Sequence, residues 1–347
     1  MLIAVAKETR SKENRVALTP AFVANFTALG YQVKIEHNAG LASGFRDEEY
    51  RQAGAEICAA PKQTFRQADI ILKIWAPEEN EISNFCANQT IVCNTRNIRT
   101  FEQLKNFSTA RVNLCALDLM PRTSRAQNMD ILSSQNNLAG YAATITGASK
   151  SPTVMPLLIT SAGTLPPLKV LIIGLGVAGL QAAATAHRLG AQVYAYDTRA
   201  ETEEQAASLG VTFVKELSAD ILSSVRLIIT SAQSFGKPAP EVLKAKQYAK
   251  LSSDCIIIDM AADDGGNINP QKLPSSITLI ADSHLERQIP YSASTLFAGN
   301  VYQFCQFLIK DNDLYFNFND DIISAVSICY HGQIRHPYLS EAKYHGV

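Results

Sequence analysis

Residues 169–180 read KVLIIGLGVAGL, and this stretch decides the fold. An apolar run that begins after a lysine and ends at a glycine is typical of a buried parallel strand. Gly174 would allow the sharp turn out of this strand, Gly176 would let the backbone approach a pyrophosphate, and Gly179 would let the next helix pack close to the sheet. The stretch therefore predicts a dinucleotide-binding turn; close packing of helix and strand without a ligand is the alternative explanation.

The segment after the glycines ends in an acidic residue at the position that such a turn requires. Residues 181–189 predict the helix, Gly190 its end, and residues 192–196 the next strand. Asp197 follows about 20 residues after the glycines, where a carboxylate can accept hydrogen bonds from a ribose 2′-hydroxyl and would repel a 2′-phosphate. The acid favours NAD over NADP, although Arg199 could hold a 2′-phosphate.

The composition is that of an ordinary globular protein. A chain of 347 residues is long enough for two domains, and 47% hydrophobic with 18% charged residues is a usual balance. The net charge of −1 gives no electrostatic basis for nucleic-acid binding. We expect a soluble chain, because no apolar stretch reaches the length of about 20 residues that spans a membrane, and because the N-terminus is too short for a signal peptide. The seven cysteines and six histidines lie without ligand spacing, so we expect reduced thiols and no metal site.

Strand-like and helix-like stretches alternate through residues 1–120 and again from the glycine-containing stretch onward. Such alternation predicts an α/β fold with two doubly wound, Rossmann-like domains and an interdomain cleft. We expect residues 1–128 plus 311–347 to form the first domain, and residues 129–310 to form the nucleotide-binding domain. Residues 294–310 have a helical pattern and would cross back toward the first domain.

A polar segment, PRTSRAQNMDILSS at residues 121–134, lies between a predicted strand and a predicted long helix. One explanation is helix capping, with Ser124 at the start and Asp130 in the next turn. The other is a polar loop at the cleft that faces the nicotinamide end of the cofactor. In that case Gln127 would bond the carboxamide, while Arg122 and Asp130 would order the loop or orient the ring. The residues alone leave both explanations open.

Nearly the whole chain resembles the soluble NAD(H)-binding component of proton-translocating nicotinamide nucleotide transhydrogenase, in the alanine dehydrogenase/transhydrogenase family. The shared motifs are RVALTP (15–20), GLASGF (40–45), MPR to LAGY (120–141), AGTLPP (162–167), the glycine turn, DTR (197–199), GKPAP (236–240) and GGN (265–267). By this resemblance the catalytic residues are Arg122, Gln127, Asp130 and Ser133, the last being the serine that contacts nicotinamide. The cofactor-binding residues would be Gly174, Gly176, Val177, Gly179, Asp197, Thr198, Arg199 and Gln233.

The resemblance implies an oxidoreductase, the alpha-subunit component of an NAD(P)⁺ transhydrogenase of the Si-specific, proton-translocating type. Such a chain binds NAD(H), exchanges hydride with NADP(H) bound on a beta-subunit domain, and is a homodimer. Proton translocation would need separate membrane subunits. The expected location is therefore cytoplasmic, peripheral to the inner (cytoplasmic) membrane through those partners.

Two alternatives are a stand-alone amino-acid dehydrogenase, which the absence of two proton-handling residues disfavours, and a non-catalytic NAD-binding module, which a shortened segment favours. Alanine dehydrogenases share Arg15 but carry a lysine where this chain has Trp75, and their catalytic histidine should lie within residues 94–97, which read NTRN. A stand-alone amino-acid dehydrogenase needs such proton-handling groups, whereas hydride transfer between two nicotinamides needs alignment. Residues 200–227 are shorter than the transhydrogenase segment that holds a mobile closing loop, so a non-catalytic NAD-binding module is the other alternative.

Overall fold

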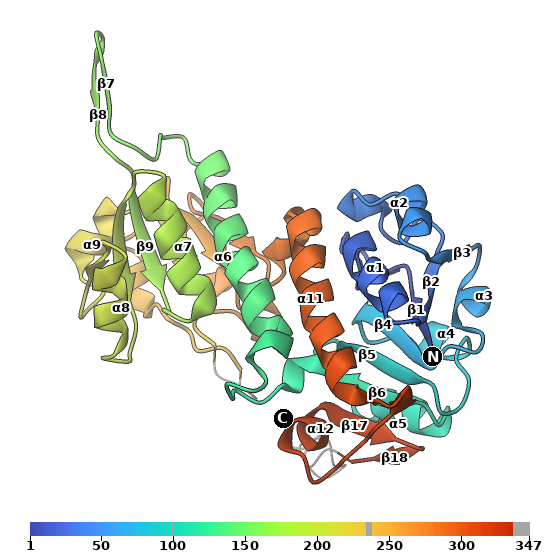
Figure 1. Cartoon of the computed structure of the whole chain (residues 1–347). Helices are drawn as coiled ribbons and strands as arrows, with labels where there is room; N and C mark the ends of the chain where they lie inside the picture. Colours follow the sequence, from blue (N-terminus) through green and yellow to red (C-terminus); the bar gives the residue numbers. More distant parts are fainter. Residues whose placement is uncertain (99, 234–237, 336–347) are drawn as a thin grey trace. The chain divides into compact units, whose positions relative to one another are not determined.

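The computed structural model describes residues 1–98, 100–233 and 238–335, and it divides the chain into two compact units (Figure 1). Unit 1 comprises Met1–Gln135 and the chain from Ile289, and unit 2 comprises Asn136–Gln288. Each unit has its own largely parallel sheet, so the predicted α/β fold with two Rossmann-like domains is confirmed. Gly236 and Lys237 of the GKPAP motif, and the tail from His336, lie outside the described residues.

The sheet of unit 2 has six parallel strands in the order β11-β10-β9-β12-β13-β14. The strands are β9 (Lys169–Ile173), β10 (Gln192–Tyr196), β11 (Thr212–Phe213), β12 (Leu227–Thr230), β13 (Ile256–Asp259) and β14 (Thr278–Ala281). The chain begins at β9, moves outward to β10 and β11, and then returns to the other side of β9 with β12. Strand order thus reverses between β9 and β12, which is the switch point where open α/β sheets bind ligands.

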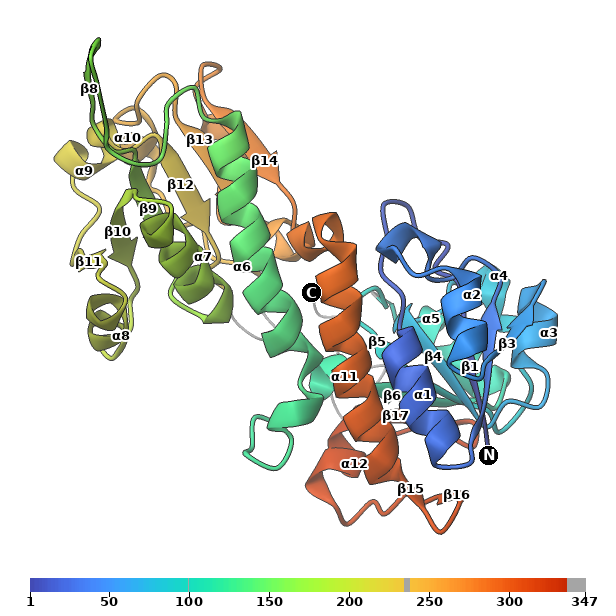
Figure 2. The same ribbon diagram turned by 45° about the horizontal axis from the view of Figure 1, so that its top comes forward.

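Helices cover the sheet of unit 2, and two of them pack unusually closely. They are the unit 2 portion of α6 (Ile131–Lys150), α7 (Val177–Arg188), α8 (Thr202–Ser208), α9 (Ala219–Ser224) and α10 (Ala245–Tyr248), with 3₁₀ turns η4 (Ala262–Asp264), η5 (Pro270–Lys272) and η6 (Leu285–Gln288). In Figures 1 and 2 α6 runs beside α7. Gly140 permits this contact, because a Cβ there would lie 2.1 Å from the carbonyl oxygen of Ala178.

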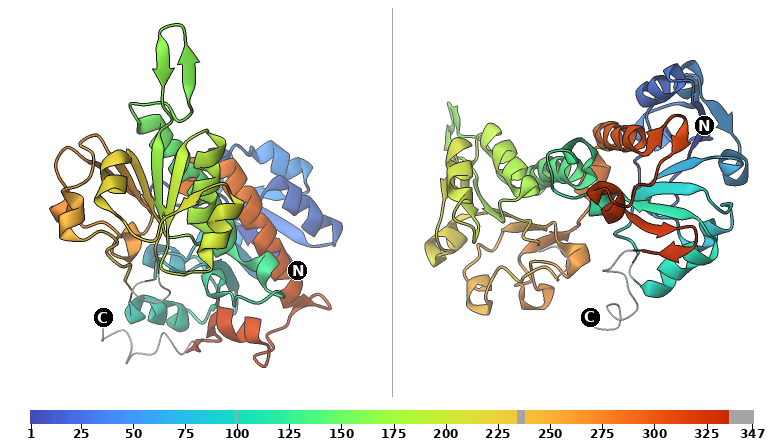
Figure 3. Two further views of the ribbon diagram at one scale, coloured as in Figure 1. Left: turned by 90° about the vertical axis from the view of Figure 1, so that its left-hand side faces the viewer. Right: turned by 60° about the horizontal axis from the view of Figure 1, so that its bottom comes forward.

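A hairpin of β7 (Leu158–Thr160) and β8 (Gly163–Leu165) extends away from the sheet of unit 2 (Figures 1 and 3). Every residue of both strands is exposed, and the Ile159 side chain is 77% exposed. The hairpin therefore exposes apolar side chains on both strands, and neither strand is part of the six-stranded sheet of unit 2.

The sheet of unit 1 has eight strands in the order β18-β17-β6-β5-β4-β1-β2-β3, and the six from β6 to β3 are parallel. They are β1 (Leu2–Val5), β2 (Gln32–Glu36), β3 (Glu56–Cys58), β4 (Ile70–Trp75), β5 (Thr90–Asn94), β6 (Asn113–Ala116), β17 (Ser327–Tyr330) and β18 (Gln333–Ile334). The helices are α1 (Pro20–Ala28), α2 (Asp47–Gln52), α3 (Pro61–Phe65), α4 (Glu79–Ile82), α5 (Phe101–Thr109), α11 (Pro290–Leu308) and α12 (Asp321–Val326). Smaller elements are η1 (Leu41–Ser43), η2 (Leu117–Leu119), η3 (Gln127–Met129), β15 (Ile309–Lys310) and β16 (Asp313–Leu314).

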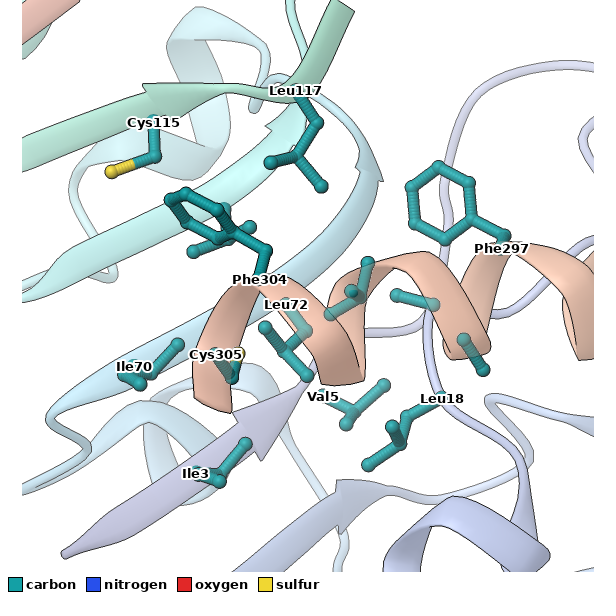
Figure 4. Packing of buried hydrophobic residues seen from close by; sticks show 14 of the residues in the cluster. Ile3, Val5, Leu18, Ile70, Leu72, Cys115, Leu117, Phe297, Phe304 and Cys305 are labelled. Carbon is teal, nitrogen blue, oxygen red and sulfur yellow. The ribbon is translucent and has the colours of Figure 1, made fainter. Parts of the chain in front are cut away.

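The long helix α11 belongs to unit 1, so the observed units have other boundaries than the predicted domains. Its Phe297 and Phe304 are buried against Val5 of β1, Leu72 of β4 and Leu117 (Figure 4). The units therefore divide after Gln135 and before Ile289, where the sequence predicts 128/129 and 310/311. The helical pattern of residues 294–310 predicts an apolar face, but it does not predict which sheet that face covers. Across the described residues, the helices are too short or too polar to cross a bilayer.

Candidate functional site

The turn after β9 is built around two glycines that internal packing requires. Gly174 has φ +93°, in the left-handed region, and a Cβ there would lie 2.8 Å from the amide nitrogen of Ala232. A Cβ on Gly179 would lie 1.8 Å from the carbonyl oxygen of Gly174. The N–H of Gly174 donates to the carbonyl of Tyr196 at 2.8 Å and so ties the turn to β10. These two glycines are explained by close packing alone.

Gly176 differs from both, because it faces open space. Its φ of −76° suits any residue, and among the described residues other than its chain neighbours, no heavy atom lies within 4 Å of the position a Cβ would take. Packing does not explain a glycine here, whereas close approach of a ligand does. Val177, 42% exposed, begins the 12-residue helix α7. The free N–H groups and positive end of that helix therefore adjoin an open position suited to a pyrophosphate.

Asp197 lies at the carboxyl end of β10 and is fixed to the glycine turn. Its Oδ2 accepts a hydrogen bond from the backbone N–H of Leu175 at 2.7 Å. Arg199 donates its backbone N–H and its Nε to Oδ1, and its Nη2 to Oδ2. Burial alone would raise the pKa of Asp197, but the bonds from Arg199 and Leu175 outweigh burial and lower the pKa, so the side chain is a carboxylate at neutral pH. Thr198 lies between the pair in sequence and is exposed.

Gln233 lies on the loop after β12, and a buried asparagine holds that loop. The Nε2 of Gln233 donates to the carbonyl of Met260 at 3.5 Å. Asn267, fully buried, accepts from the N–H of Ala232 at 3.0 Å and donates to the carbonyl of the same residue at 2.8 Å. The sequence marks Asn267 only as one residue of the GGN motif. Ala232 is 35 residues away from Asn267 in sequence, so no local sequence pattern predicts that Asn267 holds the loop.

The eight predicted cofactor-binding residues therefore gather at one edge of the unit 2 sheet. They follow β9, β10 and β12, which are neighbours in the sheet, at their carboxyl ends. This edge contains the switch point, where a dinucleotide can lie across the turn with its pyrophosphate at the helix N-terminus. Their contact with a nucleotide stays a prediction.

The four predicted catalytic residues lie near the start of α6 in unit 1. Asp130 accepts two hydrogen bonds from Ser133, at 3.0 Å from its backbone N–H and at 2.5 Å from its hydroxyl. Asp130 therefore caps α6, and the capping explanation was wrong in placing Ser124 at the helix start, because Ser124 lies outside α6. Arg122 and Gln127 are exposed. The structure thus brings Asp130 and Ser133 together, and the meeting of all four residues with the nucleotide in one cleft stays a prediction.

The loop that carries Gln127 is held against α11 and α12. Arg125 pairs with Asp320 at 2.7 Å and also with Asp321. The backbone carbonyl of Asn128 accepts from the side chain of Asn300 at 2.8 Å. Buried Ala126 and Met129 lie on either side of Gln127. The loop is therefore well placed by its neighbours, and its exposed side chains project from a fixed backbone.

Two family models cover almost all of the chain. The model described as "Alanine dehydrogenase/PNT, N-terminal domain" matches residues 4–139, and "Alanine dehydrogenase/PNT, C-terminal domain" matches residues 143–337. This chain belongs to the alanine dehydrogenase/PNT family. Within the family, the match to transhydrogenase subunits extends over more of the chain than the match to alanine dehydrogenases.

The chain is 35% identical to the protein named as the first part of NAD(P) transhydrogenase subunit alpha in Rhodospirillum rubrum, over 98% of this chain and 99% of the relative. It is 30% identical to the alanine dehydrogenase of Methanococcus maripaludis, over 77% of this chain and 74% of that enzyme. The solved transhydrogenase of Sinorhizobium meliloti superimposes with a TM-score of 0.90 at 34% identity, over 97% of this chain and 99% of that chain. The family assignment predicted from the motifs is confirmed.

Arg15, which this chain shares with alanine dehydrogenases by resemblance, and Trp75, where those enzymes carry a lysine, are joined in unit 1. Arg15 is 3% exposed, and its Nε and Nη2 bond the two carboxylate oxygens of Glu13 at 2.8 and 2.6 Å. Trp75, in place of a lysine, donates its indole N–H to the same carboxylate at 2.6 Å. Burial would raise the pKa of Glu13, but the bonds from Arg15 lower it. The arginine is thus paired with a carboxylate of the protein itself, and its neighbour at position 75 cannot transfer a proton as a lysine amine does.

A buried ionic cluster occupies the carboxyl ends of β1 and β4 in the same unit. The Nζ of Lys73 lies 2.7 Å from Glu81 and 3.9 Å from Glu8, and the Glu8 carboxylate accepts from the N–H of Ile74. Burial would lower the pKa of Lys73, but the two carboxylates raise it. The cavity beside the cluster has ≈ 10 Å³, which is room for about one water molecule and too little for an amino acid. We interpret the cluster as structural.

Replacing Glu8 by glutamine is expected to stabilise this protein at neutral and alkaline pH. Burial, the largest effect, raises the pKa of Glu8 from 4.5 to about 7 despite the attraction of Lys73. The folded protein therefore binds this proton more tightly than the unfolded chain. The resulting stability is complete below pH 4.5 and is lost as pH rises through about 7. Above that pH the variant should gain ~1–3 kcal/mol in free energy of unfolding.

Urea denaturation of both proteins near pH 4.5 and near pH 8 measures this effect. We expect the free energies of unfolding of the wild type and of Glu8→Gln to become equal near pH 4.5. A difference of the same size at both pH values would contradict the role of the Glu8 proton.

Proposed function

We propose that this chain is the NAD(H)-binding component of a proton-translocating transhydrogenase and exchanges hydride with NADP(H) bound on a partner subunit. The observation that carries the proposal is the open position at Gly176, at the switch point of the unit 2 sheet and beside a fixed carboxylate. The Rhodospirillum rubrum relative, which is named for the alpha subunit of a transhydrogenase and aligns over almost the full length of both chains, supports the partner-dependent reaction.

Each group of residues has a distinct role in this proposal. Bound NAD(H) supplies or accepts the hydride. Backbone N–H groups of the turn hold the pyrophosphate, and the Asp197 carboxylate orients the adenosine ribose. On unit 1, Gln127 would bond the carboxamide, while Arg122, Asp130 and Ser133 would orient the ring. The chain needs no general acid or base, since no proton moves at the reacting carbons.

The same proposal places the chain in the cytoplasm, at the inner (cytoplasmic) membrane through partner subunits that carry protons across it. The name of the Rhodospirillum rubrum relative denotes one portion of a larger alpha subunit and supports separate partners. In this arrangement the NADP(H)-binding domain of the beta subunit docks where the nicotinamide is presented.

We also propose a homodimer, with the β7–β8 hairpin packed on a second copy. An isolated two-stranded hairpin is marginally stable in water, and this one exposes Leu158, Ile159 and Leu165. A second copy would bury these side chains and support the hairpin. Replacing Ile159 by aspartate is therefore expected to convert dimer to monomer in analytical ultracentrifugation, while Gln205→Asp, at an exposed position of α8 away from the hairpin, serves as the control. A wild-type chain that sediments as a monomer would contradict the dimer.

The reaction is tested by mixing the chain with NADH and an NADP analogue, with and without the NADP(H)-binding component of the Rhodospirillum rubrum enzyme. We expect hydride transfer only when that component is present. Turnover of NADH with a 2-oxo acid and ammonium, without any partner, would instead establish a stand-alone dehydrogenase. NADH binding without transfer in any mixture would establish the non-catalytic module.

The length of the chain favours the non-catalytic NAD-binding module as the second candidate function. The alignment with the Rhodospirillum rubrum relative runs over 380 residues, 33 more than the 347 of this chain, so the relative has segments that this chain lacks. Between Ala200 and β12 the chain forms only α8, β11 and α9. A shorter segment beside the nucleotide would exclude less water from the reacting centre.

A further inference from the structure

The carboxylate proposed to bind ribose is already saturated with donors. A carboxylate has about four lone-pair positions. Oδ1 of Asp197 accepts from the backbone N–H and the Nε of Arg199, at 2.9 and 3.1 Å. Oδ2 accepts from the N–H of Leu175 at 2.7 Å and from the Nη2 of Arg199 at 2.9 Å. A ribose hydroxyl can therefore bond this carboxylate only after one of these donors leaves.

Only the two donors of the Arg199 side chain can leave without unfolding the turn. The N–H of Leu175 belongs to the glycine turn, and the backbone of Arg199 is fixed because its carbonyl accepts from the Thr202 hydroxyl at 2.7 Å. By contrast, the Arg199 side chain is 51% exposed and lies over an Asp197 side chain that is 8% exposed. The guanidinium thus covers the carboxylate and occupies the positions that ribose hydroxyls would take.

We propose that Arg199 is a specificity-determining residue, which covers Asp197 in the free protein and must swing away when the ribose of NADH binds. Because it covers the lone pairs that meet the ribose 2′-position, the displaced guanidinium lies within reach of a 2′-phosphate and pairs with the phosphate of NADPH. Arg199 therefore weakens NADH binding and strengthens NADPH binding. It reduces the preference for NADH over NADPH that Asp197 creates. This inference rests on the proposed NAD(H) site.

Replacing Arg199 by methionine tests the inference, since methionine keeps an unbranched apolar stem and removes every donor. Dissociation constants of NADH and NADPH are measured with the full-length chain near pH 8, where Asp197 is ionised. An exposed ion pair of this kind corresponds to a change of about two- to fivefold. We expect NADH to bind about two- to fivefold more tightly to Arg199→Met, and NADPH to bind more weakly by at least the same factor.

Arg188→Met is the matched control, because Arg188 is also exposed but ends α7 at the opposite end from the turn. It should leave both constants unchanged. A variant that only loosened the turn would weaken both nucleotides together, so the opposite signs separate the two roles. Weaker or unchanged NADH binding by Arg199→Met overturns the inference while leaving the proposed function intact. No nucleotide binding by the wild-type chain would remove the proposed function, and the inference with it.

Discussion

Gly179→Ala is expected to destabilise unit 2 severely, whereas Gly176→Ala leaves stability almost unchanged and weakens NADH binding. A Cβ at position 179 would lie 1.8 Å from the carbonyl oxygen of Gly174, and neither atom belongs to a flexible side chain. The start of α7 would have to move away from the strand, at a cost of at least about 3 kcal/mol. At position 176 the added methyl meets no atom of the described residues within 4 Å beyond its chain neighbours, and φ is −76°. Stability should change there by less than about 1 kcal/mol.

The methyl at position 176 would occupy the space through which a pyrophosphate approaches the backbone. We therefore expect Gly176→Ala to raise the NADH dissociation constant about tenfold or more, which corresponds to ~1.4 kcal/mol. Urea denaturation and NADH titration of both variants measure the two effects separately. If Gly176→Ala binds NADH as the wild type does, this turn does not hold the pyrophosphate.

The strand, turn and helix of unit 2 could be predicted from sequence because their signals are local. The apolar run fixes β9, and the spacing of Gly174, Gly176 and Gly179 places α7 directly after it. The same holds for the long helix that the sequence predicts next to the polar segment, which is observed as α6 (Ile131–Lys150). Each of these features depends on residues within a few positions of one another.

The remaining features depend on contacts between residues far apart in sequence. The bond from Arg15 to Gln135 joins residues 120 positions apart, and Asn267 supports Ala232 across 35. The β7–β8 hairpin lies in an apolar stretch without regular alternation, and nothing in that pattern distinguishes it from a buried segment. The Asp197–Arg199 pair is local, yet its consequence depends on counting acceptor positions, which needs the geometry.

Gln127→Ala is expected to slow hydride transfer far more than it weakens NADH binding. Gln127 is exposed on a backbone that Arg125 and Asn128 hold to α12 and α11. Removing its amide should leave the loop in place, because these anchors and the buried Ala126 remain. If Gln127 aligns the nicotinamide, its loss leaves the ring misplaced, and a misplacement of about 1 Å can cost about 100-fold in rate.

The measurement compares single-turnover transfer, in the mixture with the NADP(H)-binding component, with NADH dissociation constants for the same variant. We expect a 10- to 100-fold loss of rate, roughly, and less than about a threefold change in binding. Thr123→Ala, an exposed position in the same loop, is the control and should change neither quantity. Equal losses of rate and binding for Gln127→Ala would mean that the glutamine only holds the nucleotide or the loop. Retention of full rate would remove it from the reaction, and the four residues of unit 1 would then have to be explained by the capping of α6 that Asp130 already performs.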